Sequence, residues 1–145
     1  MWTWLKENAD PAMVVITTLG FAFTVWQLQQ ANTALKASNG YEVQKDAREY
    51  IKEILSDASF REVLNGMKQA DSNSQEKLWL MFNFYRSVHR EEKAGVLTDE
   101  FTAAIHEDFC DFLKLQPVAE GWKKLLTEGR VGDGHSSMRK EWCGT

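Results

Sequence analysis

The sequence predicts an all-α protein, with one N-terminal transmembrane helix followed by a soluble domain of four to five helices. Residues 11–35 contain no charged side chain, whereas charged residues make up 26% of the chain. Beyond residue 40, apolar residues recur at helical spacing, and no long stretch alternates with period two. A helix rises about 1.5 Å per residue, so the uncharged run spans roughly 37 Å, longer than the roughly 30 Å of a hydrocarbon core.

The flanks of this run favour a transmembrane helix over residues 11–37 and an interfacial segment over residues 1–10. Trp2, Trp4 and Trp26 stand near its two ends, as expected of residues in an interfacial aromatic belt. The alternatives are a cleaved signal peptide and a buried core helix. A signal peptide has a basic start, and a core helix has one polar face, whereas residues 12–26 are apolar or small on all sides.

Gly20 and Thr24, four residues apart, have the small-residue spacing that lets two membrane helices approach. The alternative is that such residues are common in membrane helices without any pairing role. The span holds no ionisable side chain, which argues against a proton or ion pathway built from this helix alone.

Positive residues predict the orientation. Only Lys6 precedes the span, whereas Lys36, Lys45, Arg48 and Lys52 follow it. Positively charged flanks stay on the cytoplasmic side. We therefore expect an inner-membrane protein with its N-terminus outside and a cytoplasmic domain over residues 41–128.

Composition narrows the function of that domain. The net charge of −4 provides no electrostatic footprint for duplex nucleic acid. Cys110 and Cys143 are the two cysteines, and in a reducing cytoplasm a structural disulfide between them is not expected.

Helical segments and their boundaries can be assigned in order. Ser38–Gly40 reads as a turn, residues 41–57 as a helix, and residues 60–67 as a second amphipathic helix. Ser72 or Ser74 is a candidate N-cap for the strongest helix, residues 75–94, which Gly95 would end. Thr98 would cap the next helix and Pro117 would start the last one. Residues 129–145 read as a flexible tail.

The segment from Leu78 to Phe101, with Ala94-Gly95-Val96-Leu97-Thr98-Asp99-Glu100 as its turn and Trp122 as the later aromatic residue, resembles a broad, uncharacterised class of small bacterial single-pass membrane proteins. The resemblance covers roughly residues 12–126. It implies architecture only, because its motifs are mostly helix caps and core positions and bring no catalytic residues.

Three patterns have chemical readings that we weigh against simpler ones. His106 and Cys110 lie one turn apart, as two metal ligands would, but no further ligand follows and core-edge packing is the simpler reading. Cys110 paired with His89, His106 or His135 lacks a recognisable nucleophile setting. Residues 129–135 are glycine-rich without the strand and Lys-Ser/Thr of a phosphate loop. We expect no enzyme activity, cofactor or metal.

Arg86, His89, Arg90 and Lys93 form a cation stripe along one side of the helix over residues 75–94. It reads either as a solvated face or, if subunits converge, as an anion site. The leading function hypothesis is a membrane-anchored accessory protein whose domain binds a protein partner or a second copy, through the exposed side of residues 75–95. The alternative is a ligand-gated membrane effector of phage-defence type, in which the stripe senses a cyclic nucleotide and oligomerised anchors disturb the bilayer.

Overall fold

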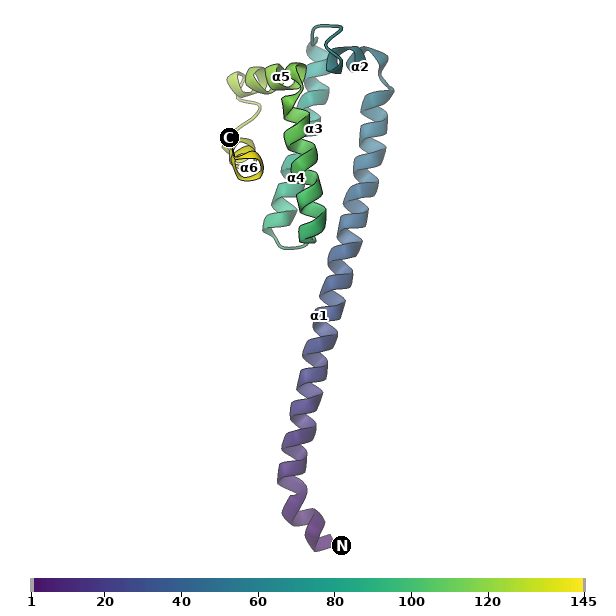
Figure 1. The fold of residues 1–145 in the computed structure, drawn as a ribbon, viewed down its shortest axis with the longest axis vertical. Helices are drawn as coiled ribbons and strands as arrows, with labels where there is room; N and C mark the ends of the chain where they lie inside the picture. The colour runs from purple at the N-terminus through teal and green to yellow at the C-terminus, as the bar shows by residue number, and fades with distance from the viewer. Residues whose placement is uncertain (1, 145) are drawn as a thin grey trace. The chain divides into compact units, whose positions relative to one another are not determined.

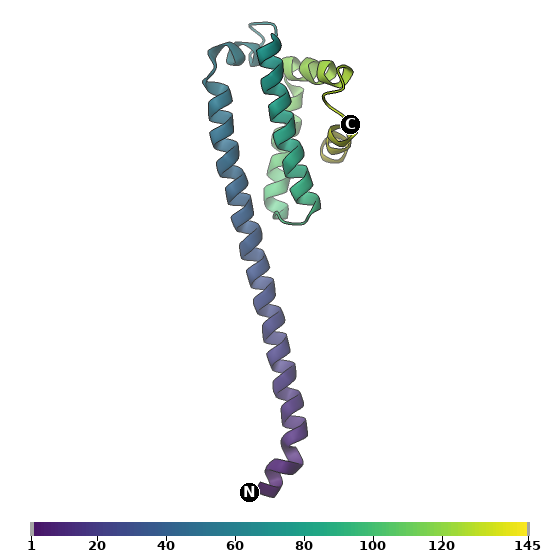
Figure 2. The same cartoon turned by 180° about the vertical axis from the view of Figure 1, so that it is seen from behind.

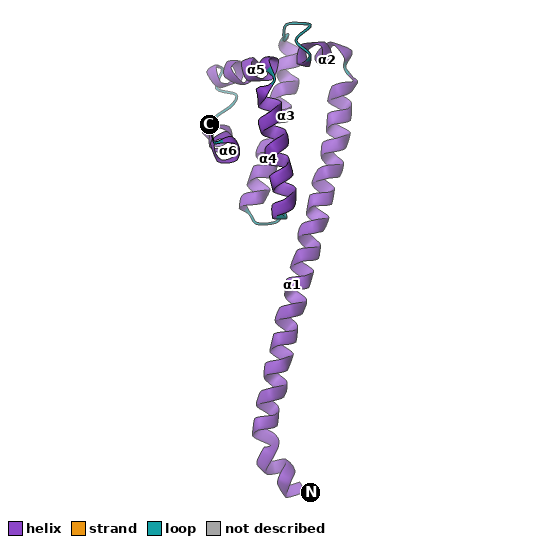
Figure 3. Cartoon of the chain, viewed as in Figure 1, coloured by secondary structure: helices purple, strands orange, loops and turns teal. Residues whose placement is uncertain are grey.

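The computed structural model describes the backbone of residues 2–144 and the side chains of residues 17–144. Every regular element in this part of the chain is an α-helix (Figure 3), which confirms the predicted all-α class. The chain divides into two compact units, residues 1–36 and residues 37–145. The helices are α1 (Trp2–Ser56), α2 (Ala58–Leu64), α3 (Ser72–Lys93), α4 (Asp99–Lys114), α5 (Gln116–Thr127) and α6 (Asp133–Cys143).

The predicted transmembrane span lies only partly within the described side chains. Residues 11–16, together with Trp2 and Trp4, are outside them. Among the residues that can be assessed, no helix combines the length and the apolar character needed to cross a membrane. From residue 17 to residue 35, all side chains of α1 are exposed.

The turn expected at Ser38–Gly40 is absent, because α1 continues through it without a break. Glycine costs a helix about 1 kcal/mol relative to alanine, so a compensating contact is expected there. Gly40 is buried and lies against the ring of Phe101. Beside it, the Asn39 side chain donates a hydrogen bond to the carbonyl of Val96 at 3.2 Å. These contacts within residues 37–145 support the helical conformation locally.

Helix α3 is the centre of the second unit and contacts α2, α4, α5 and α6 (Figures 1 and 2). Its predicted apolar stripe is confirmed, because these residues are buried: Leu78, Met81, Phe82, Tyr85 and Val88. The ring of Phe82 packs edge-on against Trp122 of α5, with centroids 4.9 Å apart. Burial beside Asp108 of α4 raises the pKa of Tyr85 to about 12. The core therefore gathers around one helix, as the width of its stripe predicted.

The helix ends follow local chemistry, with one correction. The N-cap of α3 is Asp71 rather than Ser72 or Ser74, because the Asp71 carboxylate accepts hydrogen bonds from both the backbone N–H and the hydroxyl of Ser74. The first of these bonds contributes most to lowering the pKa of Asp71 to about 2. Thr98 caps α4 as predicted. Gly95 adopts a positive φ of +70°, the left-handed conformation expected just after a helix.

The prediction of a flexible tail over residues 129–145 is wrong for most of that range, because residues 133–143 form α6. This helix packs against α3 and α4. Val131 before it and Met138 within it are almost completely buried in the core. Gly129 lies in the connection to this packed helix, Gly132 is its N-cap and Gly134 lies in its first turn.

Candidate functional sites

Helix α6 covers part of the cation stripe of α3, namely His89 and Arg86, whereas Arg90 and Lys93 stay exposed. His89 is 4% exposed, and its Nε2 lies 3.1 Å from the Glu141 carboxylate. The ammonium group of Lys93 lies 2.5 Å from the same carboxylate. The Lys93 hydrogen bond, followed by that of His89, lowers the pKa of Glu141 to about 2. Glu141 thus provides from within the chain a negative charge for His89 and Lys93, the charge that the anion-site interpretation assigned to a ligand.

Arg86 also faces α6, at the start of that helix. A Cβ atom at Gly134 would collide with the Arg86 guanidinium, so the guanidinium lies directly on the glycine backbone. Its Nη1 is 3.5 Å from Nδ1 of His89. Burial, with a smaller contribution from Arg86, lowers the pKa of His135 on α6. Of the four predicted stripe residues, Arg90 and Lys93 lie exposed to solvent, so the structure does not bring the four together in one open pocket.

Trp142 is the centre of an aromatic and polar cluster between α3, α4 and α6. His106 stacks on its ring with centroids 4.5 Å apart, and His89 meets the ring edge-on at 5.4 Å. The indole N–H donates to Glu92 at 2.8 Å. His106 Nε2 is 3.0 Å from the other Glu92 oxygen, an ion-pair distance without hydrogen-bond alignment. Trp142 therefore holds α6 in place through contacts within the chain.

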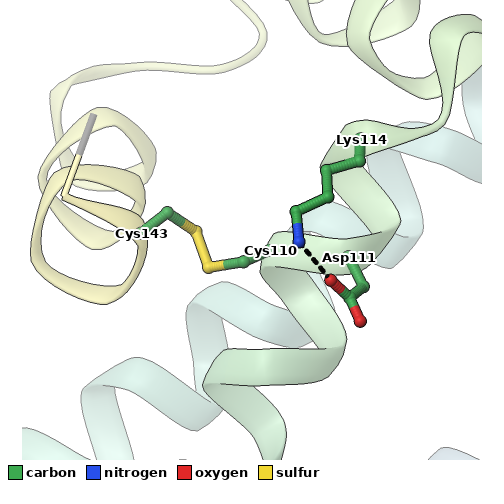
Figure 4. The surroundings of a disulfide bond; sticks show 4 residues. All are labelled: Cys110, Asp111, Lys114 and Cys143. Carbon is green, nitrogen blue, oxygen red and sulfur yellow. Dashed lines mark hydrogen bonds and ion pairs between the residues drawn. A yellow bond between two sulfur atoms is a disulfide. The ribbon is translucent and has the colours of Figure 1, made fainter.

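Cys110 of α4 is bonded to Cys143 of α6, which overturns the expectation of two free thiols (Figure 4). Their Cα atoms are 5.7 Å apart, within the usual range for a disulfide. The two residues stand 33 positions apart, so no local sequence pattern indicated the pairing. The bond engages the sulfur that the metal and nucleophile hypotheses had invoked. No cluster of three or more metal-ligating side chains is found among the described residues.

An open pocket of about 460 Å³ lies beside this disulfide. Both cysteines are half-buried rather than enclosed. Two cations, Lys114 and Arg139, stand one turn from the two cysteines. The pocket is lined by His106, Glu107, Cys110, Leu113, Lys114, Arg139, Trp142 and Cys143.

A second, larger groove of about 820 Å³ lies between the α2–α3 loop and the start of α5. Its rim carries two exposed apolar side chains, Met67 at 78% and Leu115 at 43% exposure. Polar side chains make up much of the remaining wall, among them Gln75, Glu120 and Lys124. This groove was not indicated by periodicity, because its lining comes from loops and helix ends.

The predicted anchoring residues whose side chains the structure describes, Gly20, Thr24 and Trp26, lie on an exposed part of α1. Nothing lies within 4 Å of a Cβ built on Gly20, and the Thr24 hydroxyl donates to the Gly20 carbonyl at 2.8 Å. Trp26 is 53% exposed, with Phe23 stacked beside it at 5.7 Å. The Gly20–Thr24 face is therefore open to a partner helix or to lipid.

Comparisons of the chain with protein-family models, with curated proteins and with solved structures give no match.

Proposed function

We propose that this protein is a membrane-tethered helical interaction module. Residues 11–37 form the anchor, and the helical unit that follows binds a protein partner or a second copy at the inner membrane surface. The observation that carries the proposal is the exposure of a set of large apolar side chains on α1: Leu19, Phe21, Phe23, Val25, Trp26, Leu28 and Leu35.

So many exposed large apolar side chains are expected to be buried against lipid or another protein. Burying one such side chain contributes about 1.5–3 kcal/mol, and contiguous apolar patches on a soluble surface mark interaction sites. Phe21 and Phe23, at 71% and 55% exposure, lie near the middle of the proposed anchor. Lipid is the cover that suits a helix whose apolar side chains are not confined to one face.

Two hydroxyl side chains of the same segment suit a medium of low dielectric. The hydroxyls of Thr24 and Thr33 donate to the carbonyls of Gly20 and Gln29, four residues earlier. In hydrocarbon an unsatisfied hydroxyl is costly, so bonding within the helix is what lipid favours. The proposal extends to residues 11–16 on the sequence alone.

The surface of the helical unit favours a polar and adaptable contact. The exposed side of α3 carries Glu76, Ser87, Arg90 and Lys93 rather than apolar residues. A contact through such a face would gain specificity from charge more than affinity from burial. Confinement to the membrane raises the effective concentration of neighbours, so a weak contact of this kind can suffice.

The alternative of a ligand-gated membrane effector has less support. Its cyclic nucleotide would have to replace Glu141 at His89 and Lys93. It would also have to lift the α6 backbone from Arg86. It stays a proposal for a state in which α6 has moved away from α3.

Extraction of membranes at alkaline pH tests the anchor in the full-length protein. We expect the unmodified chain to stay in the membrane pellet. Phe21→Arg/Phe23→Arg should shift it to the supernatant, because each arginine at the centre of a span costs about 2.5–3.5 kcal/mol on insertion. Asn32→Arg/Ala34→Arg is the matched control, since arginines near the end of a span can reach the headgroups. Release of the unmodified chain would contradict the proposal.

A further inference from the structure

The disulfide fastens α6, the helix that covers Arg86 and His89, and we propose that it is reversible. In this proposal Cys110 and Cys143 form a thiol–disulfide exchange site that is open to a dithiol through the adjoining pocket in the folded protein. Their redox state then sets how tightly α6 stays on α3. The inference is independent of the membrane anchor, because it rests on residues of the second unit alone.

The first argument is access. Both cysteines are half-buried, and both line the open pocket of about 460 Å³. That volume lies within the range of pockets that admit small molecules. A disulfide inside the core would be reached only on unfolding, whereas this bond joins two half-buried residues, Cys110 on α4 and Cys143 on α6 (Figure 4).

The second argument is the charge around the pair. Arg139 stands four residues before Cys143, and Lys114 stands four residues after Cys110. Nearby cations favour a thiolate, which is the reactive form of cysteine. Lys114 is partly neutralised by Asp111, whose carboxylate is 2.6 Å from its ammonium group. The Nε of Arg139 is buried without a hydrogen-bond partner, and its guanidinium carbon lies 5.7 Å from the centre of the Trp122 ring.

The exchange balances with a dithiol as co-reactant. One thiolate of the dithiol attacks Sγ of Cys110 or Cys143, the S–S bond breaks, and the other cysteine leaves as a thiolate that takes up a proton. The second thiol of the reagent then attacks the mixed disulfide and releases the remaining cysteine. Two electrons and two protons pass to the protein, and the dithiol becomes a cyclic disulfide.

The third argument is what the bond fastens. Without it, α6 is held by the burial of Met138 and by the stacking of Trp142 on His106. It is also held by the Trp142–Glu92 hydrogen bond and by the Glu141 contacts with His89 and Lys93. The Lys93–Glu141 ion pair among them lies near the surface, where water can replace it. Removing the covalent link therefore raises the population of molecules in which α6 has opened, and opening uncovers Arg86 and His89.

The test uses the full-length protein in mild detergent with the disulfide formed. Dithiothreitol is added over a range of concentrations without denaturant, and free thiols are counted by alkylation and mass. We expect a reduction rate proportional to dithiothreitol concentration and at least tenfold above the rate of global unfolding. A rate independent of dithiothreitol and equal to that of unfolding would overturn the proposal and leave a purely structural disulfide.

Amide hydrogen exchange then measures how reduction of the disulfide changes the opening of α6. On reduction, amides of residues 133–143 should exchange at least tenfold faster, while those around Phe82 in α3 keep their protection. His89 should become more reactive to diethyl pyrocarbonate. In the Cys110→Ser/Cys143→Ser variant, amide exchange of residues 133–143 should be as fast as in the reduced protein and should not change on addition of dithiothreitol. Equal protection of α6 in both redox states would contradict the coupling even if exchange is fast.

Discussion

Two regions of this chain use the same apolar residue types in helices with opposite results. In α1, Phe21 is 71% exposed, whereas Phe82 in α3 is fully buried between neighbouring helices. The difference lies in the surroundings, because residues 37–145 fold several helices around α3 while residues 1–36 form a separate compact unit. Apolar surface that the chain does not cover itself is what the proposed function assigns to lipid.

The comparison also separates two kinds of polar group. In α1 the hydroxyl of Thr24 is satisfied within its own helix. In the second unit the polar groups of His89 and Trp142 are satisfied by partners about 50 residues away, Glu141 and Glu92. A hydroxyl that bonds within its own helix keeps that hydrogen bond when the surroundings of the helix change. The polar groups of α6, in contrast, depend on partners elsewhere in the fold.

Truncating a phenylalanine in each region gives the largest expected contrast. Phe82→Ala removes a fully buried ring from contact with Trp122 and should lower the free energy of unfolding by about 3–5 kcal/mol. Phe21→Ala should leave the unfolding of the second unit unchanged, because its ring lies outside that core. Thermal unfolding followed by near-ultraviolet circular dichroism in detergent measures both. Equal losses would contradict the separation of the two units.

Two glycines provide a second, smaller contrast. A Cβ at Gly121 would collide with Cδ1 of the buried Leu78, at the contact of α5 with α3. Gly121→Ala should therefore cost about 1–3 kcal/mol through overpacking. Gly20→Ala meets nothing within 4 Å and should be neutral or slightly favourable for the helix. Urea titration of both variants measures the pair, and a neutral Gly121→Ala would show that Leu78 can move aside.

Much of this fold could be predicted from local sequence patterns. The stripe of α3, the capping role of Thr98 and the left-handed Gly95 all follow from residues within one or two turns of each other. Asp71, and not Ser72 or Ser74, caps α3 because it directly precedes the first helical residue and its carboxylate is a stronger acceptor than a hydroxyl. That choice depends on where the helix begins, which periodicity leaves open.

The candidate sites were harder to predict because they depend on long-range pairing. Residues 129–145 read as a tail since their glycines stand out, while Met138 is the one fully buried apolar side chain within α6. The pairing of Glu141 with His89 and of Cys110 with Cys143 joins positions 52 and 33 residues apart. Spacing alone cannot indicate such pairs. The sequence indicated the cation stripe of α3, but it did not indicate Glu141 as the partner of His89 and Lys93.

The smallest expected effect concerns the hold of α6 on α3 in acid. The contacts of Glu141 with Lys93 and His89 lower its pKa in the fold to about 2, below its ordinary value of 4.5. A carboxyl group with a lowered pKa stabilises the fold above pH 4.5, and this contribution disappears as the pH falls from 4.5 towards 2. The melting temperature of Glu141→Gln should thus lie below that of the unmodified protein at pH 7 and converge with it near pH 2. Glu62→Gln, which removes an exposed carboxylate on α2, is the matched control. A constant gap between Glu141→Gln and the unmodified protein at all pH values would show that Glu141 acts through packing rather than charge.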